Sequence, residues 1–400
     1  MAPVDVLRPE KTALATVRDH LRVLYVIDES RVDAVSDHLI KGLRRLKRMQ
    51  LRAAVVSLGP HGDATERIQS QDLPVVSLEA ADAGGLRGLS ADLRALFGLR
   101  TVIGRFRPQV LHALGPRSRL LAGFAALFRP GLKVIDGPFI GPANRGFRRS
   151  FEGLSHKVGA GRVLIVEDAE RARTARDRFG AEQPVEVVGH LIDAAAARSS
   201  AVWGFDRLPG DRYYVGASVA PGACSDLRRL LEAFRIFSAH RSDAVLLVLG
   251  DAAHMKPGSW PEDLRIEDRV MFVRPPTEAA MVLRRLSVLW VTGDPRPDQE
   301  SILQAMTVGT PVVCDSTTDL GPLIERIGGA LMRDRRWPRQ FAEATRDLER
   351  DPALHRAVSA AGRALVDQCF PAEAWARKVR DLYARVALAD DPGPEPSPLS

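Results

Sequence analysis

Cysteine is scarce in this sequence of 400 residues: Cys224, Cys314 and Cys369 lie far apart, and no C-x-x-C pair occurs. That spacing argues against a zinc site and against a disulfide framework. We expect the three side chains to serve as small buried hydrophobic groups. The sequence also lacks any run of about 18 apolar residues, so it predicts no membrane-spanning helix.

Several catalytic and cofactor motifs are missing as well. The sequence has no G-x-G-x-x-G after a first strand and no G-x-x-x-x-G-K-[ST], which disfavours a dinucleotide or P-loop enzyme. It has no H-E-x-x-H, no G-x-S-x-G and no D-x-D for a metal-bound nucleotide sugar. We therefore expect no metal cofactor.

Charges and prolines interrupt residues 1–20, so this segment lacks the apolar core of a signal peptide. We expect it to be a partly disordered arm, and residues 389–400 to be a disordered tail. The chain between them, with 45% hydrophobic and 27% charged residues overall, is typical of a globular protein. A cytoplasmic protein of two domains, each of about 150–200 residues, is the expectation.

Apolar runs rich in β-branched residues alternate with helical patterns along the chain. In the first half we expect strands at the positions 21–28, 53–58, 74–78, 109–114, 133–137, 162–168 and 185–193. Helical patterns lie between them, and such alternation predicts a parallel sheet covered on both faces. The first domain is thus expected at 21–193.

The same plan restarts after an irregular stretch, 194–211, which we interpret as a linker. Strands are expected at 212–218, 244–251, 269–273, 288–294 and 310–315, followed by three terminal helices. The second domain is expected at 212–388. Two Rossmann-like domains of this kind hold a ligand in a cleft that the carboxyl ends of their strands face.

Positive charge is concentrated in one segment. Between Arg100 and Ser150 there are ten basic residues and a single acid, Asp136. Such a segment is either a solvated arginine-rich face or a surface for an anionic partner. Within it, the pattern at 145–159 predicts an amphipathic basic helix, which either packs on the sheet or contacts a membrane. Peripheral membrane contact through 100–158, at the inner face of a membrane, is one expectation; nucleic acid is not an expected partner.

The second half contains AVLLVLGD, DRVMFV, VLWVTG and LQAMTVGTPVVCD in that order, with the terminal helices after them. This series of segments resembles the retaining nucleotide-sugar glycosyltransferases of the GT-B architecture (family 4, group 1 type). RPQVLHALG, GRVLIVEDAER and VEVVGHLID extend it more loosely into the first half. It implies a nucleotide sugar as co-substrate and a cell-surface, lipid or polysaccharide acceptor.

The resemblance implies a donor site with cations around a diphosphate. It also implies a carboxylate that accepts hydrogen bonds from the ribose hydroxyls. Here Ala217 follows Gly216 where the family has arginine, and no lysine occurs between Lys157 and Lys256. The two family glutamates correspond to Arg296 and Gln304. The donor-site motifs are therefore degenerate.

Other residues remain candidates for the donor site. Asp298 and Glu300 begin the helix of the DQES stretch, and their negative charges would repel a phosphate there. Arg296 and Arg274 are the only cations nearby in the sequence that could compensate, and an ordinary surface arginine is the favoured alternative for Arg274. The donor-binding residues implied by the resemblance are Gly216, Ser218, Asp251, Arg274, Arg296, Glu300, Ser301 and Gln304.

In the first half, His112 and Asp136 are the catalytic candidates. His112 lies in the 109–114 strand, where the family commonly has a histidine, and Asp136 takes the position of another family histidine. The structural alternative for His112 is a hydrogen-bonded core histidine, and that for Asp136 is a turn aspartate. The sequence thus supports two functions: an active glycosyltransferase, or a catalytically inactive relative that acts as a binding or scaffold subunit.

Overall fold

The structure is a computed structural model that describes residues 21–28, 34–49, 51–80, 85–127, 129, 131–137, 162–199, 212–219, 224–249, 260–273, 279–292, 299–318, 320–334, 336 and 338–388. The expected arm, tail and basic helix at 145–159 lie outside these residues, as does most of the expected linker. The chain divides into two compact units. Unit 1 comprises Met1–Leu191 and Glu373–Ser400, and unit 2 comprises Ile192–Ala372.

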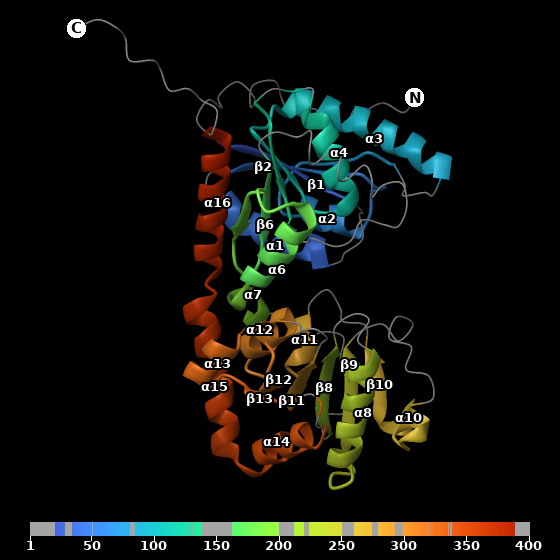
Figure 1. Ribbon diagram of the computed structural model, residues 1–400, viewed down its shortest axis with the longest axis vertical. Helices are drawn as coiled ribbons and strands as arrows, with labels where there is room; N and C mark the ends of the chain where they lie inside the picture. Colours follow the sequence, from blue (N-terminus) through green and yellow to red (C-terminus); the bar gives the residue numbers. More distant parts are fainter. Residues whose placement is uncertain are drawn as a thin grey trace, which may run out of the picture. The chain divides into compact units, whose positions relative to one another are not determined.

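Unit 1 contains a parallel seven-stranded sheet with the order β3-β2-β1-β4-β5-β6-β7 (Figure 1). The strands run along apolar segments as the sequence predicts. They are β1 (Arg22–Ile27), β2 (Arg52–Ser57), β3 (Val75–Ser77), β4 (Val110–Ala113), β5 (Lys133–Asp136), β6 (Arg162–Val166) and β7 (Val185–Val187). The strand order reverses between β1 and β4, which pair directly with Val23 opposite Val110.

The helices of unit 1 cover both faces of this sheet because parallel strands need crossover connections. They are α1 (Ala34–Lys47), α2 (Asp63–Gln69), α3 (Gly85–Phe106), α4 (Pro116–Ala126), α6 (Ala169–Phe179) and α16 (Ala372–Leu388). One face is packed with residues of α3, α4 and the central strands, among them Leu99, Leu121 and Leu111.

Unit 2 contains a parallel six-stranded sheet with the order β10-β9-β8-β11-β12-β13. Its strands are β8 (Tyr213–Val219), β9 (Ala244–Leu249), β10 (Val270–Val273), β11 (Val288–Thr292), β12 (Val312–Asp315) and β13 (Leu331–Arg333). Numbered within the unit, this is the 3-2-1-4-5-6 order of the Rossmann fold, and it reverses between β8 and β11.

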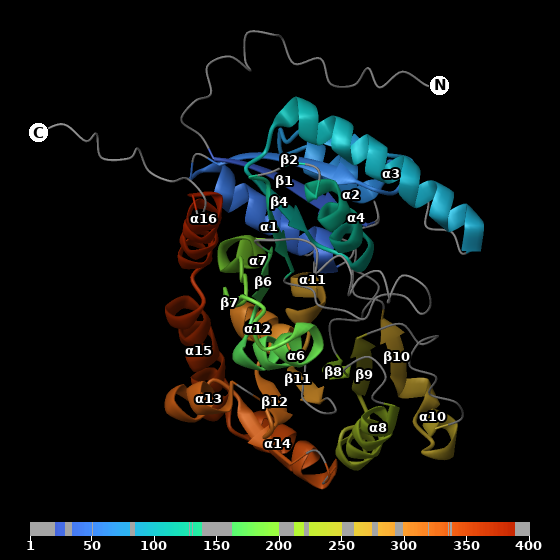
Figure 2. The same cartoon turned by 45° about the horizontal axis from the view of Figure 1, so that its top comes forward.

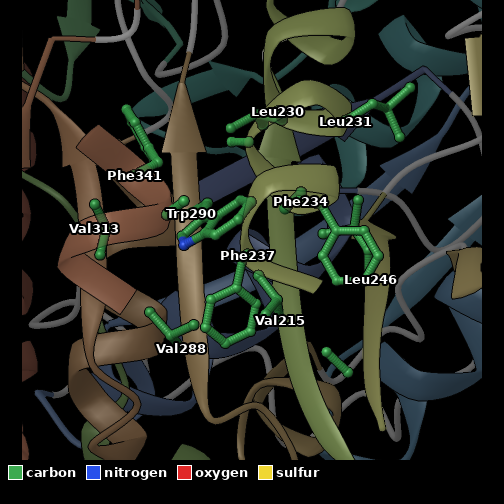
Figure 3. Packing of buried hydrophobic residues seen from close by; sticks show 14 of the residues in the cluster. Val215, Leu230, Leu231, Phe234, Phe237, Leu246, Val288, Trp290, Val313 and Phe341 are labelled. Atoms are coloured by element: carbon green, nitrogen blue, oxygen red, sulfur yellow. The ribbon is translucent and has the colours of Figure 1, made fainter. Parts of the chain in front are cut away.

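The helices of unit 2 are α7 (Ala194–Ser199), α8 (Cys224–Ser238), α10 (Trp260–Asp263), the 3-10 turn η1 (Glu267–Arg269), α11 (Ala279–Leu283), α12 (Gln299–Val308), α13 (Gly321–Ile327), α14 (Pro338–Arg350) and α15 (Pro352–Cys369). Trp290 of β11 is fully buried between α8 and α14, edge-on to Phe341 with ring centroids 6.1 Å apart (Figure 3). Its indole N–H donates to Thr345 Oγ1 at 2.8 Å, so burial leaves no unsatisfied donor.

The AMTVGTPVV segment is the junction between α12 and β12. Gly309 ends the helix with φ at +86°, and its N–H donates to the Ala305 carbonyl at 3.0 Å. A Cβ at this position would lie 1.7 Å from Nη1 of Arg363. The Pro311 carbonyl then accepts from Leu289 N–H, which starts the pairing with β11. The left-handed backbone therefore favours glycine here, and a Cβ would in addition displace the end of the exposed Arg363 side chain.

The terminal helix α16 lies in unit 1, whereas the sequence pattern predicts it in the second domain. Trp375 packs so closely on α1 that a Cβ at Gly42 would be 2.9 Å from its ring. Tyr383 of the same helix bonds Tyr25 of β1 at 2.9 Å. An apolar helical stripe shows that a helix is partly buried, but it does not identify the sheet against which the helix packs.

We predict that Gly309→Ala lowers the unfolding free energy by more than Gly328→Ala. Both glycines end a helix at positive φ, +86° and +77°, but the Cβ of an alanine at position 328 would meet nothing within 4 Å. Gly328→Ala should cost about 1–2 kcal/mol for the left-handed backbone alone. Gly309→Ala must also displace the exposed Arg363 side chain and should cost roughly 0.5 kcal/mol more. Urea unfolding checks this, and equal losses would contradict it.

Candidate functional site

The carboxyl ends of β8 and β11 form the point in unit 2 where the strand order reverses. Open parallel sheets bind ligands at such switch points. Ser218 of β8 lies opposite Val291 of β11, and its hydroxyl donates to Ser301 Oγ of α12 at 3.0 Å. Ser218 is 6% exposed. This polar contact thus joins the end of the strand to the first turn of the helix.

The first turns of α12 carry an acid held by an amide. The Gln304 side-chain N–H donates to Glu300 Oε1 at 2.8 Å. Since the amide nitrogen bonds the carboxylate, the amide oxygen of Gln304 points elsewhere. Both residues are half-buried, while Ile302, Leu303 and Ala305 on the other side of the helix are fully buried. The negative charge of this pair resides on Glu300.

Gly216 and Ala217 lie inside β8 rather than in a loop. A Cβ at Gly216 would be 2.3 Å from Cδ1 of Leu286, so packing explains this glycine. Ala217, in the place of the family arginine, is fully buried among apolar residues of the unit. The small side chain lets the strand continue through this position.

The remaining donor-site candidates lie in segments that the structure does not describe. Asp251 follows β9, Arg274 follows β10, and Arg296 precedes α12. Asp298 belongs to the same undescribed segment as Arg296. They remain candidates only because they lie close in the sequence to the ends of β9 and β10 and to the start of α12.

Sequence reasoning did not single out Thr292 at the end of β11. It is paired in register with Val219 of β8 and is 2% exposed. Its hydroxyl has no hydrogen-bond partner among the described residues. A buried hydroxyl without a partner at a strand end is the kind of group that a polar ligand or water satisfies. Its place at the end of the VLWVT strand is the signal that could have identified it.

The equivalent switch point in unit 1 is occupied by a carboxylate. Asp28 directly follows β1 and accepts from the backbone N–H groups of Arg117 at 2.9 Å and Ser118 at 2.5 Å. These groups belong to the first turn of α4, which is the positive end of the helix dipole. A Cβ at Gly115 would lie 2.4 Å from the Asp28 carboxyl carbon, so this approach requires glycine. Asp28 takes the place that an external anion would use.

His112 is buried within unit 1 in a chain of hydrogen bonds. Its Nε2 lies 2.8 Å from the Gly137 carbonyl oxygen, which can only accept, so Nε2 carries the proton. In neutral histidine Nδ1 is then the acceptor, and the Tyr383 hydroxyl donates to it at 2.7 Å. Tyr25 in turn donates to Tyr383 at 2.9 Å. The chain joins β1, β4 and α16.

Burial sets the protonation states in this chain. It lowers the pKa of His112 to about 4, although the bond to the Gly137 carbonyl acts in the opposite direction. Burial also raises the pKa of both tyrosines above the ordinary value. All three groups are therefore neutral at pH 7, as the deduced directions of the hydrogen bonds require.

Asp136 is fully buried and forms an ion pair with Arg162. Oδ2 of Asp136 lies 3.0 Å from Nε of Arg162, whose side chain is 2% exposed. Arg162 also donates to the Arg119 backbone carbonyl, so it joins β6 to the start of α4. The catalytic roles assigned to His112 and Asp136 stay predictions. In the structure both side chains connect elements of unit 1.

The described part of the basic segment 100–150 is divided between the interior and the surface. Arg117, Arg119 and Lys133 are buried, while Arg100, Arg105 and Arg107 are exposed. Within the described residues no group of three or more His, Cys, Asp or Glu side chains could hold a metal ion. No described helix is both long and apolar enough to cross a membrane.

Two parallel α/β units with Rossmann-type strand order, and a terminal helix that packs on the first, define a protein of the GT-B class. Two family models match the chain, the glycosyl transferase 4-like domain over 32–191 and glycosyl transferases group 1 over 213–351. The chain therefore belongs to the group 1 (family 4) glycosyltransferases. No curated protein matches it in sequence.

Solved structures share the fold at low sequence identity. Anabaena HepE, solved in complex with UDP-glucose, has a TM-score of 0.72 at 14% identity and covers 91% of this chain and 100% of its own. Sucrose-phosphate synthase from Thermosynechococcus elongatus has a TM-score of 0.68 at 16% identity, with coverage of 92% and 100%. A glycosyltransferase from Rickettsia africae has a TM-score of 0.69 at 12% identity, with coverage of 92% and 99%.

We predict that His112 makes unit 1 less stable as the pH falls from about 6.5 to about 4. The unfolded chain binds a proton at His112 near pH 6.5, whereas the folded chain resists until about 4. The contribution of His112 to the unfolding free energy is therefore fully present above the pKa of the unfolded chain. As the pH falls to about 4, about 3 kcal/mol of it is lost. Urea unfolding at pH 7 and pH 4 checks it.

His112→Gln should remove this part of the pH dependence, and Tyr25→Phe should retain it because His112 is still buried. If the unfolding free energies of the wild type and His112→Gln depend on pH in the same way, burial does not lower the pKa of His112 and the prediction is wrong.

We predict that Asp136→Asn lowers the unfolding free energy by about 3–5 kcal/mol, because it leaves the buried charge of Arg162 without its partner. Arg162→Gln in the Asp136→Asn background removes that charge and should recover much of the loss. Thermal unfolding measures both variants. A fully stable Asp136→Asn variant that is inactive would instead support the catalytic assignment.

Proposed function

We propose that this chain is a retaining glycosyltransferase whose unit 2 binds a nucleoside-diphosphate sugar. The acceptor is proposed to be a cell-surface, lipid or polysaccharide group. The observation that carries the proposal is the contrast between the two switch points. In unit 2 the switch point presents Ser218, Ser301 and the Glu300–Gln304 pair, whereas in unit 1 the Asp28 carboxylate occupies it.

Each polar group at the unit 2 switch point has a role in this proposal. Glu300 supplies the carboxylate that accepts from the ribose hydroxyls, and Gln304 orients it. This arrangement places the charge one helical turn before the position of the family's second glutamate. The Ser218–Ser301 contact fixes the first turn of α12 against β8. The HepE complex with UDP-glucose supports the choice of donor class.

The diphosphate needs cations because its negative charge increases as the bond to the sugar carbon breaks. Ala217 cannot supply one, and the segment between Lys157 and Lys256 contains no lysine. We assign this role to Arg274 and Arg296, which adjoin β10 and α12 in the sequence. Since neither arginine stands at the position of a cation that the family pattern uses, transfer is expected to be slow.

A second function, a catalytically inactive binding or scaffold subunit, is favoured by a specific observation in unit 1. Asp28 accepts from two backbone N–H groups of α4, so no acceptor phosphate can use that helix end. His112 and Asp136 are likewise engaged in internal contacts. In this alternative the nucleotide sugar still binds unit 2 but no sugar is transferred.

We predict that Glu300→Gln weakens binding of UDP-glucose, or of whichever nucleotide sugar binds best in a panel, by roughly five- to tenfold. A neutral acceptor forms a weaker bond than a charged one, by about 1 kcal/mol or more. Calorimetric titration measures the affinity. Glu325→Gln, an exposed acid on α13 of the same unit, is the matched control and should leave it unchanged.

The exchanged pair Glu300→Gln with Gln304→Glu retains one acid and one amide, and should recover most of the affinity. If no nucleoside diphosphate or nucleotide sugar binds at millimolar concentration, the proposal is wrong. If one binds but no transfer or donor hydrolysis occurs, the inactive alternative holds.

A further inference from the structure

Thr292, the last residue of β11, carries a buried hydroxyl that packing does not explain. The side chain is 2% exposed, and its oxygen has no hydrogen-bond partner among the described residues. A buried hydroxyl without a partner lowers the stability of the folded chain, whereas valine would fill nearly the same volume with apolar atoms. A ligand that bonds the hydroxyl accounts for threonine at this position.

The strand geometry places this hydroxyl on the side of the unit 2 sheet that α8 and α14 cover. Trp290, two residues earlier in β11, packs with residues of both helices, and side chains two apart in a strand share a face. Figure 2 shows α8 and α14 next to each other in unit 2. Because β11 ends at Thr292, the hydroxyl lies at the carboxyl edge of this face, which is the edge where open parallel sheets bind ligands.

A carboxylate lies beside Thr292 at the end of the next strand. β11 and β12 pair in parallel with Val291 opposite Cys314. One residue further along both strands, the same register brings Thr292 beside Asp315 on the same face of the sheet. Asp315 is 1% exposed, and its Oδ1 accepts from the Thr317 N–H at 3.0 Å. A carboxylate has about four acceptor positions, so it can also accept from a ligand.

A hydroxyl beside a carboxylate matches a ligand group that both donates and accepts hydrogen bonds. A sugar hydroxyl does both, because it can donate to the carboxylate and accept from the threonine. A diphosphate oxygen only accepts, and the negative charge of Asp315 would repel it. The ribose hydroxyls are assigned to Glu300 of α12, a helix whose buried side chains pack on the opposite face of the sheet.

We propose that Thr292 and Asp315 bind a hydroxyl of the hexose that the nucleotide donor carries. Thr292 donates to the oxygen of that hydroxyl, and Asp315 accepts a hydrogen bond from it. This assignment rests on the proposed donor site and goes beyond it, since it names residues that contact the sugar. Neither residue makes or breaks a bond to the sugar, so their contribution is to the binding and orientation of the hexose.

Calorimetric titration of the full chain separates the sugar from the rest of the donor. The two probes are the nucleotide sugar that binds best in the panel, such as UDP-glucose, and its nucleoside diphosphate alone. Thr292→Val should weaken binding of the nucleotide sugar by roughly tenfold, because it removes one buried hydrogen bond. Binding of the diphosphate should be unchanged. Thr292→Ser retains the hydroxyl and should bind both probes as the wild type does.

Ser359→Ala is the matched control. The Ser359 hydroxyl on α15 is also buried and has no hydrogen-bond partner among the described residues, so its removal should leave both affinities unchanged. Thermal unfolding without ligand shows whether each variant is folded. Thr292→Val should keep or raise the unfolding midpoint, since it removes an unsatisfied buried group. A lower midpoint would assign the hydroxyl a partner within the chain and overturn the proposal.

Two results in the titrations would also overturn the proposal while the proposed function stands. One is equal binding of the nucleotide sugar by the wild type and Thr292→Val. The other is an equal loss of affinity for the nucleotide sugar and for the diphosphate, which would place the contact on the nucleotide. If the wild type binds no nucleotide sugar, the proposed function is wrong and this assignment is wrong with it.

Discussion

The direct pairing of β8 with β11 is the interaction on which the chemistry of unit 2 depends. Because the strand order reverses there, the connections leave in opposite directions and the two strand ends remain accessible to a ligand. The register brings Ser218 and Val291 side by side, and α12 begins beside them. Gly309 then ends α12 so that β12 can pair with β11. The proposed donor site is a consequence of this local topology.

Unit 1 has the same topology but uses it differently. Its switch point lies between β1 and β4, and the Asp28 carboxylate caps α4 there. The buried interior beyond it is held by neutral hydrogen bonds around His112 and by the Asp136–Arg162 ion pair. Both groups are costly to bury alone, which is why each has a partner. The interior of unit 1 thus combines an apolar core with these two buried polar groups.

Much of the fold could be predicted from the sequence because its signals are local. Runs such as LRVLYVID and AVLLVLGD are strands because β-branched and apolar residues suit a sheet buried on both faces. Gly309 and Pro311 mark the helix end and the strand start from residue type alone. The short strand β13 and the helix α13 were missed, since segments of three and seven residues carry no clear period.

The partners of the site residues could not be predicted, because they come from distant parts of the chain. Tyr383 lies 271 positions from His112, and no pattern within a window of the sequence connects them. Asp28 bonds an amide 90 positions away, and its role follows from the sheet order rather than from its neighbours. The departures at Ala217 and Gln304 were visible in the sequence. The hydrogen bond from the Gln304 amide to the Glu300 carboxylate was not.

The most direct test of the account is amide hydrogen exchange of the full chain with and without UDP-glucose. Binding at the unit 2 switch point predicts slower exchange at the end of β8 and in the first turns of α12, around Ser218 and Ser301. The amides of Arg117 and Ser118 should be unaffected, because Asp28 already occupies them. Slower exchange at Arg117 and Ser118 with no change in α12 would contradict the account.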